Sequence, residues 1–217
     1  MHFSYCFSRA GAARLLIRWR QFRVLLRRSL RGDETELTRG PIGRAVFILA
    51  VPMILEMVME SVFAVVDIFY VSRLGSTAVA VVGLTEATVT LVYAVAIGLS
   101  MAVTAMVARR IGEKNLEGAR QAAAQALWLG LAVAAVIGSI GITAAPEILA
   151  LMGADDDVIR QGTGYTATLL GGSVTIMYLF LINAIFRGAG DAGIAMRALW
   201  LANGINLVLD PLLIFGL

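Results

Sequence analysis

Two aspartates lie inside long apolar runs, where acidic residues are rare: Asp67 near the end of one run and Asp210 inside another. A carboxylate at the centre of a bilayer costs about 2.5–3.5 kcal/mol on insertion scales, so such residues usually serve an ion or proton pathway. The structural alternative is that each acid hydrogen-bonds a neighbouring helix or faces the interface. We expect both to bind a proton or a hard cation such as Na⁺, between which the sequence does not choose.

Further polar residues share the helix faces of these aspartates. Glu56 and Glu60 fall within about 40° of Asp67 on a helix, so they could line the same cavity or cap contacts between helices. Asn183 is a further candidate for that lining. Asn183 and Glu86, each in another apolar run, are nevertheless interpreted more readily as structural.

Around Asp210, the spacing again places the polar residues on one helix face. Asn203 and Asn206 precede it by seven and four positions. Pro211 has no N–H, so the carbonyl of Leu207 loses its helical donor and could turn toward a cation. Facing polar stripes on two helices would form one oxygen-rich pocket, in which burial and a second carboxylate both favour uptake of a proton.

Composition identifies the class of protein. Of the 217 residues, 59% are hydrophobic and 15% are charged, whereas about a quarter of a soluble domain is charged. This favours an all-α, polytopic membrane protein that contacts the lipid bilayer. The single cysteine and single histidine, near the amino terminus, form no metal cluster. With no nucleophile motif or phosphate loop, we expect neither an enzyme nor a metal site, and the basic excess follows from membrane topology rather than nucleic-acid binding.

Five apolar segments are long enough to cross a bilayer core of about 30 Å. They span residues 45–71, 78–107, 122–145, 164–186 and 194–216. Residues 1–36 form a separate basic segment and linker, and residues 37–217 form the membrane part. Within the basic segment, residues 14–30 suit a helix on an anionic membrane surface. A targeting peptide, or a start codon placed upstream of the true one, is the alternative.

The distribution of Lys and Arg predicts the orientation. Residues 1–44, 108–121 and 187–197 carry 16 of the 18 basic residues, and the other loops carry Arg73 and Arg160. Because basic residues concentrate on the cytoplasmic side, we expect a cytoplasmic amino terminus in the cell (plasma or inner) membrane.

Six motifs in order resemble one family. They are AVPMILEMVMESVFAVVDIFYVSRLG (50–75), AVVGLT (80–85), ARRIGEKNLEGA (108–119), ILALMGAD (148–155), FRGAGD (186–191) and NLVLDPLLIFG (206–216). Together they resemble the amino-terminal half of a multidrug and toxic compound extrusion (MATE) transporter. The resemblance covers residues 37–217.

This resemblance implies twelve helices in two six-helix lobes, of which the five spans would form most of one. It also implies export of amphipathic or cationic small molecules in exchange for H⁺ or Na⁺, with no other cofactor. By motif, the family's coupling residues correspond to Asp67, Asn206 and Asp210. FRGAGD would be the cytoplasmic turn between the fourth and fifth helices.

The sequence departs from the family because the sixth helix and the carboxy-terminal lobe are missing. Alternating access rocks one lobe against another, so we expect a fragment or truncated gene, or else a half-size protein that dimerises. The five helices should leave an open flank beside the fifth. One alternative function is a flippase for lipid-linked precursors, which needs a basic cavity, whereas the intramembrane charges here are acidic with Arg in the loops. A non-transporting membrane fragment is the other.

Overall fold

The computed structural model describes residues 23–27, 30 and 41–216. Its elements are α2 (Ile42–Val71), η1 (Ser72–Leu74), α3 (Ser76–Gly112), α4 (Leu116–Thr143), α5 (Ala145–Leu151), α6 (Asp156–Gly171), α7 (Ser173–Gly188) and α8 (Ala192–Phe215). The described part is therefore all-α, as predicted. Residues 23–27 are helical, and the rest of the predicted surface helix at 14–30 lies almost wholly outside the described residues.

Within the described residues, five helical units are long and apolar enough to cross a membrane, which confirms a multi-pass membrane protein. Two features differ from the sequence expectation. The third span ends at Thr143 and a short helix, α5, follows it. The fourth span is longer than predicted and consists of α6 and α7, which are interrupted at Gly172.

Three of the helices begin at a side chain that caps their first turn. Asn115 accepts a hydrogen bond from the N–H of Gly118 at the start of α4, and Asp155 accepts one from Val158 at the start of α6. The third is α8, where the capping residue is Asp191. Such caps satisfy N–H groups that have no partner within the helix, and they place the helix starts at the turns.

The end of α3 and the turn that follows it carry an exposed ion pair, in which Glu113 lies beyond the membrane-crossing helix. Arg109 Nε donates to Glu113 Oε1 at 2.9 Å, and Arg110 donates to the other carboxylate oxygen at 3.1 Å. The hydrogen bond from Arg109 is the main reason that the pKa of Glu113 lies below its ordinary value.

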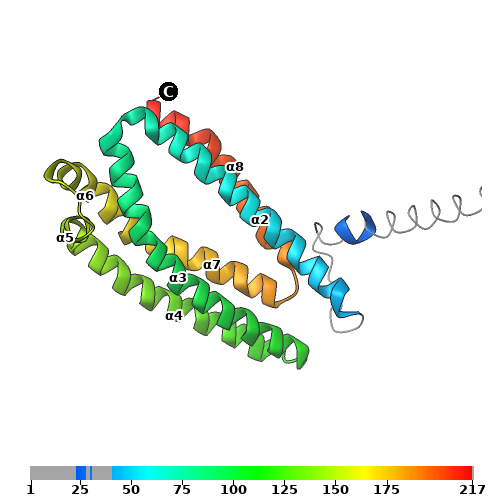
Figure 1. The fold of residues 1–217 in the computed structure, drawn as a ribbon. Helices are drawn as coiled ribbons and strands as arrows, with labels where there is room; N and C mark the ends of the chain where they lie inside the picture. The colour runs from blue at the N-terminus through cyan, green and yellow to red at the C-terminus, as the bar shows by residue number, and fades with distance from the viewer. Residues whose placement is uncertain (1–22, 28–29, 31–40, 217) are drawn as a thin grey trace, which may run out of the picture.

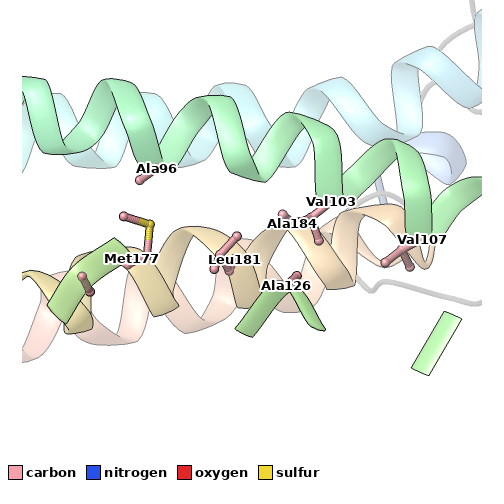
Figure 2. Packing of buried hydrophobic residues seen from close by; sticks show 8 residues of the cluster. Ala96, Val103, Val107, Ala126, Met177, Leu181 and Ala184 are labelled. Carbon is pink, nitrogen blue, oxygen red and sulfur yellow. The ribbon is translucent and has the colours of Figure 1, made fainter. Parts of the chain in front are cut away.

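The centre of the bundle is the packing of α3 and α4 against α7. Figure 2 shows side chains of these helices pointing toward one another across small residues. The cluster contains Ala96, Val103, Val107, Ala126, Ala134, Met177, Leu181 and Ala184. Between membrane helices there is little hydrophobic driving force, so close van der Waals packing through small residues stabilises the association.

The buried face of α4 carries glycines where α6 approaches. A Cβ at Gly141 would collide with the Cβ of Leu170, and one at Gly138 would lie 3.2 Å from the backbone oxygen of Gly171. These glycines thus allow α4 and α6 to approach closely.

Gly141→Ala is expected to destabilise the protein by about 1–3 kcal/mol, because the methyl group meets an atom that cannot move without its backbone. The control is Gly98→Ala on α3, where a Cβ would have no neighbour within 4 Å. Thermal unfolding in detergent should show a lower midpoint for Gly141→Ala alone. Equal midpoints for the two variants would contradict the close α4–α6 contact.

The first and fifth spans form a pair that stands apart from the α3–α4–α6–α7 body. Figure 1 shows α2 and α8 side by side and running in the same direction, and the two helices pack along their length. α2 remains one helix through Pro52. One side of α8 presents exposed apolar side chains, among them Trp200, Leu201, Ile205 and Val208.

Candidate proton or cation site

The pairing of α2 with α8 brings Asp67 and Asp210 together. Both side chains are half-buried, and they lie close enough for their charges to interact. Oδ2 of Asp210 is fully buried and has no hydrogen-bond partner among the described residues. Two carboxylates in a poorly solvated place are not stable together when both are charged, so the pair favours a proton or a cation.

The amides of α8 accompany Asp210 at helical spacing. Asn206 lies one turn before it and is exposed, and Asn203 is half-buried a further turn back. By helical spacing, both lie on the side of α8 that carries Asp210. Asn206 is exposed, whereas a residue inside a closed pocket would be buried.

Glu86 on α3 lies near the same pair, although from sequence it is interpreted more readily as structural. Its charge interacts with that of Asp67, and the hydroxyl of Tyr165 on α6 lies within electrostatic range of both. The sequence could have indicated this role for Glu86, because it is an acidic residue inside an apolar span, as the two aspartates are. Glu86 therefore adds a third carboxyl group, from a third helix, to this region.

These carboxyl groups influence one another electrostatically and do not form a ready-made metal-binding site of acidic side chains. Among the described residues, no group of three or more His, Cys, Asp or Glu side chains is arranged to hold a metal ion.

Glu56 does not join this group. Its Oε2 accepts a hydrogen bond from Arg187 Nη1 at 3.2 Å, and the side chains of Glu56 and Arg187 are only 8% and 18% exposed. Glu60 is exposed one turn further along α2, and Asn183 is buried in α7. The polar stripe of α2 is thus divided: Glu56 contacts Arg187 of α7, and Asp67 lies in the region of Asp210.

Arg187 corrects the sequence-based statement that the intramembrane charges are all acidic. The sequence assigns it to a loop that begins at residue 187, whereas α7 continues to Gly188 and the guanidinium turns back to a buried carboxylate on α2. No local signal marks this pairing, because it depends on how α7 packs beside a helix that is distant in the sequence.

The carboxyl end of α7 is held tightly against α3. A Cβ at Gly188 would lie 2.8 Å from the carbonyl oxygen of Thr104, and the Thr104 hydroxyl donates to the carbonyl of Ala184 at 3.2 Å. The following turn is closed by Asp191, which accepts a hydrogen bond from the N–H of Ile194 at 3.1 Å. This turn fixes where α8 starts relative to α7.

Comparison with known proteins identifies the family. The MatE family model matches residues 52–212, which include α3 to α7 and most of α2 and α8. The chain belongs to the MatE family.

Curated MatE relatives match most of this chain but less than half of their own length. A protein of Shewanella oneidensis named FAD transporter is 29% identical over 85% of this chain and 41% of its own. The probable multidrug resistance protein NorM of Thermotoga maritima is 26% identical over 77% of this chain and 36% of its own. The chain thus spans about 40% of such relatives, within their amino-terminal half.

Solved MatE structures share the fold. A MOP superfamily transporter from Pyrococcus furiosus superimposes with a TM-score of 0.78 and 34% identity, over 83% of this chain and 40% of that one. An outward-facing multidrug resistance MATE family transporter gives a TM-score of 0.76 at 35% identity. The arrangement of helices described above is therefore that of MATE transporters.

Proposed function

We propose that this chain forms the amino-terminal lobe, or most of it, of a transporter that exports amphipathic or cationic small molecules in exchange for H⁺ or Na⁺. The observation that carries the proposal is the packing of α2, which carries Asp67, along α8, which carries Asp210. Oδ2 of Asp210 is buried and has no hydrogen-bond partner within the described part of the chain. Asp67, Asn206 and Asp210 would bind the coupling ion. Glu60 and Asn203 would line the adjoining path.

The coupling follows from the change in charge at this pair. A bound proton or cation neutralises part of the repulsion between Asp67 and Asp210, so it stabilises the arrangement in which α2 and α8 lie closest there. Release of the ion favours a looser arrangement. Rocking against a carboxy-terminal lobe would convert that difference into alternating access, so such a lobe is the proposed partner.

The names of relatives support export of drug-like molecules. One relative is the multidrug export protein MepA of Staphylococcus aureus. The two proteins are 20% identical over 82% of this chain and 40% of MepA. We place the protein in the plasma membrane with its amino terminus in the cytoplasm, because 16 of its 18 basic residues would then face the cytoplasm.

Transport of FAD is a second candidate, favoured by the Shewanella relative. FAD carries a pyrophosphate, which basic groups would have to bind. In α2 to α8 the basic side chains lie within two turns of a helix end, and Arg187 is already paired with Glu56. The acidic interior favours a cationic substrate over this alternative.

Everted membrane vesicles test the proposal, prepared from cells that express the protein from its natural gene. A fluorescent cationic dye is expected to accumulate when an H⁺ or a Na⁺ gradient is imposed, and dissipating that gradient should stop it. FAD uptake is measured in parallel. FAD accumulation without dye accumulation would favour the second candidate, and movement of neither would contradict ion-coupled transport.

A further inference from the structure

The Glu56 carboxylate uses only half of its capacity to accept hydrogen bonds. Its side chain is more than nine-tenths buried, and Oε2 is bound to Arg187. The other oxygen, Oε1, is fully buried and has no hydrogen-bond partner among the described residues. Buried polar atoms without partners are rare in native structures and call for an explanation.

A proton is the ligand that fits this oxygen. A bound metal cation needs several oxygen ligands, and the described residues offer no group of three acidic, His or Cys side chains arranged to supply them. The guanidinium of Arg187, 3.2 Å from Oε2, would also repel a second cation. A proton requires one oxygen and no additional space.

The Glu56–Arg187 ion pair connects α2 to a part of the bundle that α2 otherwise touches little. Arg187 lies at the end of α7, where Gly188 packs against the backbone of α3, so the guanidinium belongs to the α3–α4–α6–α7 body. Glu56 belongs to α2, which packs mainly on α8 and only slightly on α3. The α2–α8 pair also reaches the body through the contact of α8 with α7, and the ion pair adds a direct link from α2 itself.

The charged groups around Glu56 leave Arg187 as its main partner. Glu60, on the same helix, acts on Glu56 from an exposed position. On the neighbouring α8, Nε of Arg197 is bound to a carbonyl of its own helix, and Asp210 interacts with an acid nearer the other end of α2. Glu56 thus changes its contact with α7 when its own charge changes.

We propose that Glu56 is a second proton-binding residue of this chain, and that proton uptake there exchanges Arg187 for H⁺ and releases α2 from α7. The carboxylate gains one proton from water, the guanidinium keeps its charge, and the ion pair is broken. This goes beyond the proposed coupling pair, because it involves other residues and a contact between α2 and α7.

The test measures the distance between α2 and α7 at two pH values. Spin labels are attached to cysteines at the exposed positions Val46 and Ala189, in a Cys6→Ser background, and the full chain is placed in lipid nanodiscs. Pulsed electron resonance should show longer distances at pH 5 than at pH 8. Glu56→Gln, which resembles the protonated acid in size and charge, should give the long distances at both pH values.

Two matched variants separate Glu56 from other acids. Glu60→Gln, one turn away and exposed, should keep the wild-type response, and so should Asp67→Asn in the proposed coupling pair. Because the readout is a distance rather than transport, it can fail or succeed independently of the proposed function. A wild-type response in Glu56→Gln, or its loss in Asp67→Asn with Glu56 intact, would overturn the inference.

A charge exchange provides the second test. The double variant E56R/R187E restores an ion pair of opposite polarity, so it should recover the short distance at pH 8 that R187E alone loses. If the double variant is as open as the single one, direct pairing does not fasten α2 to α7, and the proposal fails.

Discussion

Asp210→Asn is expected to abolish ion-driven efflux, reducing the rate in vesicles to that of vesicles without the protein. The amide keeps the size and most of the polarity of the acid but cannot carry the charge that a proton or Na⁺ neutralises. Asp67→Asn should have the same effect, because in the proposed site the charge of one carboxyl group acts on the other. Dye accumulation under an imposed H⁺ or Na⁺ gradient is the measurement, and immunoblotting of the membranes establishes that insertion is intact.

The control for this prediction is Asp156→Asn at the exposed start of α6, which makes the same chemical change outside the α2–α8 pair. It should leave efflux unchanged. The double variant D67N/D210N should be no worse than either single variant, since the residues of one site are not additive. Wild-type efflux by either single variant would refute the assignment of the coupling site.

Arg187→Ala is expected to destabilise the protein by about 3–5 kcal/mol, because it leaves the buried carboxylate of Glu56 without its counter-charge. The loss should be greater at pH 8 than at pH 5, since a proton can neutralise Glu56 in acid but not in base. The free energy of unfolding in mixed micelles, followed by circular dichroism, is the measurement.

Arg109→Ala is the matched control for Arg187→Ala. Arg109 is 79% exposed in its ion pair with Glu113, and such exposed pairs contribute little. The variant R187M/E56L, which replaces both charges with apolar side chains, should recover most of the lost stability. If Arg187→Ala behaves like Arg109→Ala, the buried pair does not stabilise the bundle.

The number of membrane spans could be predicted from sequence because a bilayer imposes a minimum apolar length on each helix. The break in the fourth span could not, since apolar residues continue on both sides of Gly172 and hydropathy does not record an interruption. α5 was missed for a related reason: at Ala145–Leu151 it is only seven residues long and follows α4 almost directly.

The candidate site was predictable to the extent that it follows helical spacing. The polar stripes predicted that α2 and α8 would pair, and the two helices do pack along their length. That Asp67 and Asp210 form one ion-binding site stays a prediction. The pairing of Glu56 with Arg187 and the approach of Glu86 to Asp67 depend on contacts between helices far apart in the sequence. Spacing within one helix carries no information on such contacts.

The parallel pairing of α2 with α8 joins the first and the last long helices of the described chain. Asp210 is synthesised roughly 140 residues after Asp67, which at about 5–20 residues per second takes roughly 7–30 s. During that interval Asp67 has left the ribosome, and the helix that will face it has not been made. The contacts that α2 makes along α8 therefore form only late in synthesis, after every other long helix of the described chain has been made.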